Sequence, residues 1–102
     1  MGAARIPIPM DEIAEFCRRN YIRRLALFGS VLRDDFTPES DVDVLVEFDP
    51  EARVSLLDVI RMERELTDSL GRKADLRTAG DLSRYFRKEV VDSAEVLYEQ
   101  AR

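Results

Sequence analysis

Hydrophobic residues recur along the chain at helical spacing in some stretches and alternate with polar residues in others. Residues 10–20 carry apolar side chains at helical spacing, with acids in the first turn and arginines in the last, as the helix dipole favours. Residues 24–28 form a short apolar run that ends at Gly29 and Ser30, which is typical of a buried strand. The chain is therefore expected to begin with a helix followed by a strand.

The clearest strand pattern covers residues 41–48. Val42, Val44, Val46 and Phe48 fall on one face, and Asp41, Asp43, Leu45 and Glu47 fall on the other. Turn-forming residues stand on both sides, at 37–40 and at 49–50. This pattern predicts a strand with one apolar face and one largely acidic face.

The second half of the chain predicts a long helix from residue 50 or 51 to Leu70, ended by Gly71. The apolar stripe of this helix holds Leu56, Val59, Ile60, Leu66 and Leu70. Glu63 lies inside that stripe, so we expect it either to pair with an arginine or to mark a surface that faces a partner.

Three shorter segments follow the long helix. Residues 73–77 predict a strand with Ala74 and Leu76 on one side and Asp75 on the other, and residues 83–92 predict a last helix. Residues 95–99 fit either a final helical turn or an edge strand. The aromatic residues of this part of the chain, Tyr85, Phe86 and Tyr98, are interpreted as core or rim residues.

The predicted order, roughly α-β-β-α-β-α, indicates an α+β protein with a small mixed β-sheet flanked by helices. No repeat or low-complexity linker divides the 102 residues, so we expect one domain over 1–102, with 1–9 as a loose N-terminal segment. No apolar run approaches the roughly 20 residues that span a bilayer. The single cysteine is compatible with a reducing compartment, and a cytoplasmic location is expected.

The composition restricts the chemistry that the chain can perform. It has no histidine and one cysteine, which excludes Ser-His-Asp triads, Cys-His dyads and histidine-based zinc or haem sites. The formal net charge is −5, and the acidity is concentrated in residues 31–50, which hold seven acids and one base. Catalysis would have to use carboxylates, hydroxyls, arginine, lysine or a metal ion.

Within this acidic stretch, Asp41 and Asp43 are two residues apart on the predicted strand. Their side chains leave the same face, and their Cα atoms are roughly 7 Å apart at about 3.3–3.4 Å per residue. Two adjacent carboxylates repel each other unless a cation lies between them. Oxygen ligands suit Mg²⁺, which takes its remaining ligands from waters and substrate phosphates.

A second feature lies upstream of the acidic pair. Gly29 and Ser30 follow a predicted strand and open a short helical turn that extends to Arg33. A glycine lets a phosphate approach the backbone, and the exposed N–H groups with the Ser30 hydroxyl form an anion site. Arg33 is either a further phosphate ligand or a partner of a nearby acid. Ten residues separate this predicted phosphate site from the predicted metal site.

The chain carries Gly29-Ser30, followed after ten residues by Asp41-x-Asp43. This pattern resembles the signature of the nucleotidyltransferase superfamily that includes polymerase beta and the aminoglycoside nucleotidyltransferases. Over residues 10–99 the chain is most similar to the minimal nucleotidyltransferase (MNT) group. The blocks that carry this resemblance are Leu27-Phe28-Gly29-Ser30-Val31-Leu32-Arg33, Ser40-Asp41-Val42-Asp43-Val44-Leu45-Val46 and Leu70-Gly71-Arg72-Lys73-Ala74-Asp75-Leu76.

The resemblance implies a nucleotidyltransferase fold and transfer of a nucleoside monophosphate, AMP from ATP being expected, to an acceptor hydroxyl. It adds Asp75 as a third carboxylate, so that Asp41, Asp43 and Asp75 would be catalytic and would hold two Mg²⁺ ions. Asp75 is also the candidate acceptor of the proton. In many members a glycine follows the motif arginine, whereas Asp34 stands there in this chain.

The resemblance also implies a partner. MNT proteins commonly act as antitoxins that silence a HEPN-domain ribonuclease toxin by attaching AMP to a tyrosine. A non-catalytic antitoxin that blocks its partner by binding, and a nucleotidyltransferase for RNA or a small molecule, remain open. The acidic composition argues against direct nucleic-acid binding, which depends on clustered Lys and Arg. Self-association and a hetero-oligomer with the partner are both compatible with the sequence.

Overall fold

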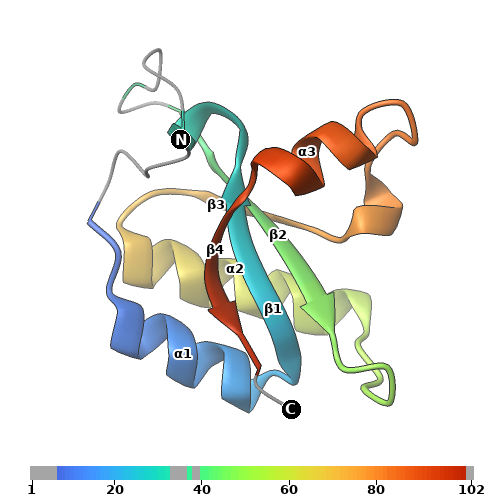
Figure 1. Cartoon of the computed structure of the whole chain (residues 1–102). Helices are drawn as coiled ribbons and strands as arrows, with labels where there is room; N and C mark the ends of the chain where they lie inside the picture. The colour runs from blue at the N-terminus through green and yellow to red at the C-terminus, as the bar shows by residue number, and fades with distance from the viewer. Residues whose placement is uncertain (1–6, 33–36, 38–39, 101–102) are drawn as a thin grey trace.

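The computed structural model describes residues 7–32, 37 and 40–100, which form three helices, four strands and two short 3₁₀ turns (Figure 1). In chain order these are α1 (Met10–Arg19), β1 (Ile22–Phe28), η1 (Gly29–Leu32), β2 (Val42–Phe48), α2 (Leu56–Leu70), β3 (Ala74–Arg77), η2 (Ala79–Asp81), α3 (Arg87–Ser93) and β4 (Glu95–Glu99). This α+β arrangement confirms the expected fold class. The interpretation of 1–102 as one domain stays a prediction, and residues 1–6 of the expected loose N-terminal segment lie outside the described residues.

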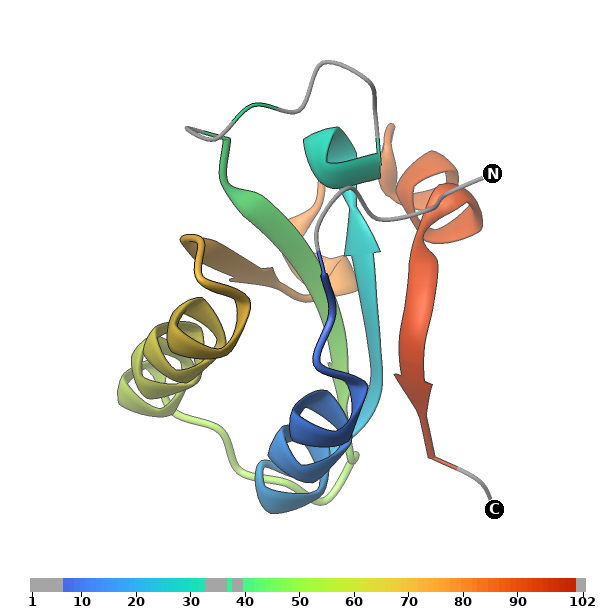
Figure 2. The same ribbon diagram turned by 90° about the vertical axis from the view of Figure 1, so that its left-hand side faces the viewer.

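The four strands form one mixed sheet in the order β3-β2-β1-β4. β1 is antiparallel to both β2 and β4, whereas β2 and β3 are parallel. Helices α1 and α2 cover one face of the sheet, and α3 with η2 lies on the other side (Figures 1 and 2). The two faces are therefore covered unequally, because α3 is only seven residues long.

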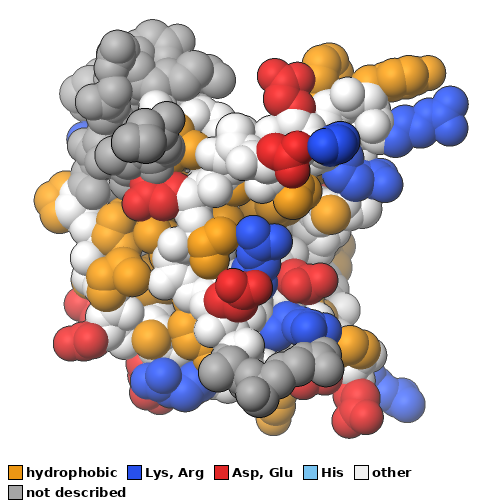
Figure 3. Space-filling view, viewed as in Figure 1, with side chains coloured by type: hydrophobic (Ala, Val, Ile, Leu, Met, Phe, Trp, Pro, Cys, Tyr) orange, Lys and Arg blue, Asp and Glu red, His pale blue; other side chains and the backbone are white. Residues whose placement is uncertain are grey.

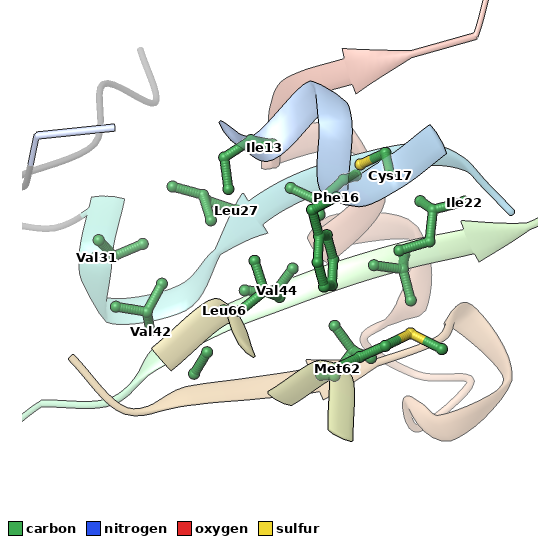
Figure 4. Packing of buried hydrophobic residues seen from close by; sticks show 14 residues of the cluster. Ile13, Phe16, Cys17, Ile22, Leu27, Val31, Val42, Val44, Met62 and Leu66 are labelled. Atoms are coloured by element: carbon green, nitrogen blue, oxygen red, sulfur yellow. The ribbon is translucent and has the colours of Figure 1, made fainter. Parts of the chain in front are cut away.

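The hydrophobic core lies between the sheet and helices α1 and α2. α1 contributes Ile13, Phe16 and Cys17, and the facing side chains of β2 include Val42 and Val44, all of them at most 2% exposed (Figure 4). Burial raises the pKa of the Cys17 thiol to about 12, so the thiol stays protonated and unreactive at neutral pH. The predicted alternation of residues 41–48 is thus confirmed.

The long helix begins later than the sequence pattern indicates. α2 starts at Leu56 because Ser55 and Asp58 form a capping box, in which each side chain accepts a hydrogen bond from the other residue's backbone N–H. The hydrogen bond that the Asp58 carboxylate accepts from the Ser55 backbone N–H also lowers the pKa of Asp58. The C-terminal end is as predicted, because Gly71 adopts the left-handed conformation at φ +71°.

The predicted apolar stripe of α2 is partly wrong. Val59, Leu66 and Leu70 pack against the core, but Leu56 and Ile60 are 76% and 47% exposed. Leu56 is the first residue of α2, and Met62, which the predicted stripe did not include, points inward at 2% exposure. A surface of α2 near its N-terminus therefore carries large apolar side chains.

Two predictions for the C-terminal part also need correction. The helix expected over residues 83–92 is shorter, with residues 84–86 forming a turn before α3. Of the two alternatives for residues 95–99, the edge strand is found, as β4. Tyr85 and Phe86 are 79% and 61% exposed, so they are not core or rim residues, whereas Tyr98 packs against the core. In the described part of the chain, no helix is long and apolar enough to cross a bilayer.

Strand β3 is the edge strand beside α2, and side chains of that helix complete its hydrogen bonds. Glu63 Oε2 accepts a hydrogen bond from the Leu76 N–H at 2.8 Å, and Thr67 Oγ1 accepts one from the Ala74 N–H at 3.0 Å. Unpaired N–H groups at a sheet edge otherwise remain open to water or to another strand. Glu63 therefore accepts a hydrogen bond from a backbone N–H, and no arginine in the described part of the chain forms an ion pair with it. The expected surface for a partner stays a prediction.

Replacing Glu63 by alanine should leave the half-buried Leu76 N–H without its acceptor. We expect Glu63→Ala to lower the free energy of unfolding by about 1–3 kcal/mol, the cost of an unsatisfied buried donor. Glu63→Gln keeps an acceptor oxygen and should lose less. Urea unfolding measures the difference, with Asp68→Ala as the control on an exposed acid of the same helix. Equal losses in Glu63→Ala and Asp68→Ala would contradict the assignment.

Candidate active site

The strand register brings the predicted site residues of three strands together. Phe28, the last residue of β1, is the Cα partner of Asp43 in β2, and Asp43 is the partner of Asp75 in β3. Neighbouring strands lie about 4.7–4.9 Å apart. The end of β1 and two of the three predicted catalytic carboxylates are therefore direct neighbours, although they are far apart in sequence.

Both carboxylates lie on the sheet face opposite α1 and α2. Their chain neighbours Val42, Val44, Ala74 and Leu76 point into the core and are at most 6% exposed. Because side chains alternate along a strand, Asp43 and Asp75 point to the other face, where both are half-buried. This confirms the predicted orientation of Asp75 and places the two acids on the face that the short helix α3 covers only in part.

Gly29 lies so close to Asp43 that a Cβ at this position would displace the Asp43 carboxylate. Its φ is +78°, and a Cβ built there would overlap Asp43 Oδ2 and lie 3.3 Å from Asp43 Cγ. Gly29 also begins the 3₁₀ turn η1, the predicted phosphate-binding segment. The backbone of the predicted phosphate site and the carboxylate of the predicted metal site are thus in direct contact.

Asp41 lies one residue before the first residue of β2. The start of β2 is anchored beside β3, because the Val42 N–H donates to the Lys73 carbonyl at 2.8 Å. Asp41 is half-buried like Asp43. Ser30 lies within η1, directly after Gly29, whereas Arg33 lies outside the described residues, and so does Asp34.

The donor set fits a hard divalent cation. Asp43 and Asp75 offer carboxylate oxygens from adjacent strands, and Mg²⁺ in phosphate-transfer sites is bound by one or two carboxylates plus substrate phosphates. Within residues 7–32, 37 and 40–100, no three His, Cys, Asp or Glu side chains form a group that could hold a metal by itself. Phosphate oxygens of a bound nucleotide would therefore have to supply further ligands.

Sequence reasoning missed the residues that hold β3 in place. Glu63 and Thr67 lie four residues apart on one side of α2 and together bind two N–H groups of the strand that carries Asp75. The available signal was a pair of polar residues at helical spacing within a stripe that is otherwise apolar. Such a pair indicates a polar target on the neighbouring element.

The fold thus places a glycine turn and two carboxylates from adjacent strands side by side on one face of a mixed sheet. A family model described as a nucleotidyltransferase domain matches residues 10–97 of the chain. The chain belongs to this family, and it is a nucleotidyltransferase.

Individual proteins are also similar to this chain, one in sequence and two in fold. The chain is 37% identical over 84 residues to the protein adenylyltransferase MntA of Thermococcus cleftensis, covering 82% of this chain and 81% of that protein. A crystal structure of a toxin–antitoxin with AMP-PNP superposes with a TM-score of 0.72, at 20% identity, over 91% of this chain and 75% of that one. The structure of the tri-AMPylated HEPN toxin of Shewanella oneidensis in complex with its MNT antitoxin superposes with a TM-score of 0.63 at 20% identity. The match covers 89% of this chain and 70% of that one. At this identity, these two structures show a shared fold.

Gly29→Ala and Gly71→Ala together test the contact between Gly29 and Asp43. Both glycines have φ near +70°, so both substitutions carry backbone strain of about 1–2 kcal/mol, but nothing lies within 4 Å of a Cβ at Gly71. We expect Gly71→Ala to lower stability by about that amount and to leave nucleotide binding unchanged. Gly29→Ala should lower stability further and weaken Mg²⁺–ATP binding by at least about tenfold, or 1.4 kcal/mol. Thermal melting and calorimetric titration measure both, and equal ATP affinity in the two variants would contradict the site.

Proposed function

We propose that the chain is a Mg²⁺-dependent protein adenylyltransferase that transfers AMP from ATP to a tyrosine hydroxyl of a HEPN-type ribonuclease toxin and so acts as an antitoxin. The observation that carries this proposal is the contact of the Gly29 backbone with the Asp43 carboxylate, beside Asp75 on the same sheet face. A phosphate site and two carboxylates in this arrangement can hold a nucleoside triphosphate at its α-phosphate.

Each predicted residue then has a defined task. Backbone N–H groups of Gly29 and Ser30 bind the pyrophosphate part of ATP, with Arg33 as a predicted further ligand. Asp41, Asp43 and Asp75 would hold the metal ions, two in number, which supply charge neutralisation and lower the pKa of the acceptor hydroxyl. Asp75, the third carboxylate that the family resemblance implies, is the proposed acceptor of the hydroxyl proton.

The reaction is a substitution at the α-phosphorus. The acceptor oxygen forms a bond to this phosphorus, the bond to the bridging oxygen of pyrophosphate breaks, and pyrophosphate leaves with that electron pair. The acceptor proton passes to an Asp75 carboxylate oxygen. The protein contributes mainly positioning and fixed charges, which are large terms in this class of reaction.

The proposal of a protein acceptor is supported by the relatives and by the surface. The Thermococcus cleftensis relative is named a protein adenylyltransferase, and one structural neighbour holds an AMPylated HEPN toxin. Tyr85 and Phe86 are exposed beside Arg84, whose guanidinium lies 5.4 Å from the Tyr85 ring. Figure 3 shows hydrophobic and basic side chains projecting together at the upper right, where Figure 1 places the segment before α3. Exposed aromatic and arginine side chains are typical of protein interfaces.

The direct experiment incubates the protein encoded beside this chain with the chain, Mg²⁺ and ATP. We expect intact-mass spectrometry to show the partner gaining one or more AMP units on tyrosine, and Asp41→Ala/Asp43→Ala to abolish the gain. The matched control is Asp11→Ala/Asp68→Ala, which removes two exposed acids on the helices of the opposite face. The control should retain full transfer.

The alternatives give different results in the same experiment. A partner that the double mutant neutralises fully, without modification, would indicate a non-catalytic antitoxin. Nucleotide found only on RNA or on a small molecule would indicate a nucleotidyltransferase that acts on that acceptor instead of on a protein. Either result would contradict the proposed acceptor.

A further inference from the structure

The chain itself exposes tyrosine hydroxyls, the chemical group that the proposed reaction modifies. Its sequence contains three tyrosines, Tyr21, Tyr85 and Tyr98. Tyr98 packs against the core, whereas Tyr85 is 79% exposed and Tyr21 is 67% exposed. Two tyrosine side chains are therefore accessible to another protein molecule, and their surroundings distinguish them.

Tyr85 lies on a turn that hydrogen bonds to Ser83 hold in place. The Ser83 carbonyl accepts from the N–H groups of Phe86 at 3.0 Å and of Arg87 at 2.9 Å. The Ser83 hydroxyl accepts from the Tyr85 N–H at 3.3 Å. On the outside of this turn, the Arg84 guanidinium carbon lies 5.4 Å from the centre of the Tyr85 ring. The exposed phenol is thus carried by a defined turn and has a cation beside it.

The charges around the two exposed tyrosines differ. Residues 82–88, which include the turn before α3, contain three bases and no acid. Tyr21 instead lines a cavity together with the acids Asp49 and Glu51. The stretch that contains the active-site motifs, residues 31–50, holds seven acids and one base. Because opposite charges steer two surfaces together and like charges keep them apart, an acidic active site selects the tyrosine of the basic turn.

The fold directs the turn away from the active site of its own chain. β4 follows α3 and begins at Glu95, whose Cα partner in β1 is Leu27, two residues before Gly29. The C-terminal end of α3 therefore lies toward the active-site end of β1. The turn with Tyr85 comes before the other end of α3, and Figure 1 shows α3 running from the outside of the molecule back toward β4. This arrangement favours an active site on a second copy of the chain.

We propose that Tyr85 is an AMPylation site of the chain itself and that a second copy of the chain modifies it. This proposal rests on the proposed function and adds a second acceptor to it. The Tyr85 Oη forms a bond to the α-phosphorus of the ATP that the second copy holds, and the bond to the bridging oxygen breaks. Pyrophosphate leaves with that electron pair, and the phenolic proton passes to Asp75 of the second copy. The product is an adenylyl tyrosine whose phosphodiester anion can pair with Arg84.

The test incubates the chain with Mg²⁺ and ATP in the absence of any partner, and intact-mass and peptide spectrometry locate the AMP. We expect one AMP unit on Tyr85, none in Tyr85→Phe, and an unchanged amount in Tyr21→Phe, the matched control on the other exposed tyrosine. Because two copies must meet, the initial rate per chain should rise in proportion to the protein concentration. Arg84→Glu/Arg87→Glu should lower this rate at least about tenfold. Melting temperatures verify that the variants fold.

A mixing experiment separates transfer between copies from transfer within one chain. The Asp41→Ala/Asp43→Ala chain keeps Tyr85 but lacks two of the proposed metal ligands. The Tyr85→Phe chain keeps these ligands but lacks the acceptor. When the two are mixed with Mg²⁺ and ATP, the Asp41→Ala/Asp43→Ala chain should gain AMP, whereas neither chain should gain it alone.

The results distinguish this proposal from the proposed function. AMP on the partner protein with none on the chain would overturn self-modification and leave the proposed function intact. AMP on Tyr21 or on another residue in place of Tyr85 would overturn the assignment of the site. An Asp41→Ala/Asp43→Ala chain that stays unmodified in the mixture would overturn transfer between copies, and an unchanged rate in the charge-reversed variant would contradict its electrostatic basis. A chain that transfers AMP neither to itself nor to the partner would contradict the proposed function.

Discussion

The close approach of the Gly29 backbone to the Asp43 carboxylate is the constraint on which the active site depends. Glycine suits this position because it tolerates φ +78° and leaves the Asp43 carboxylate in place, whereas a Cβ would displace that carboxylate. The contact brings the predicted phosphate-binding turn next to the predicted metal-binding carboxylate of Asp43. A nucleotide bound at this point would contact both, which explains how a chain of 102 residues without histidine can belong to a family of phosphoryl-type transferases.

The third carboxylate depends on a different interaction. Asp75 lies on an edge strand of four residues, and short edge strands have few hydrogen bonds of their own. Glu63 and Thr67 of α2 bind the N–H groups on the outer side of this strand, so the position of Asp75 is supported from the opposite side of the sheet. The α2 helix therefore contributes to the proposed catalysis through β3, without contacting the reacting atoms.

The sequence predicted those features that short-range patterns determine. Alternation identified β2 and the side to which Asp75 points, and Gly71 marked the end of α2. Features that depend on contacts distant in sequence were not predictable, such as the acceptor role of Glu63, the exposure of Leu56 and the pairing of residues 95–99 with β1.

The most direct test of the active-site assignment is a crystal structure of the chain with ATP and Mn²⁺, in which anomalous scattering locates the metal. The account predicts Mn²⁺ bound to the Asp43 carboxylate and to ATP phosphate oxygens, with the triphosphate against the backbone of Gly29 and Ser30. Mn²⁺ bound to other acids, or a triphosphate away from Gly29, would contradict it.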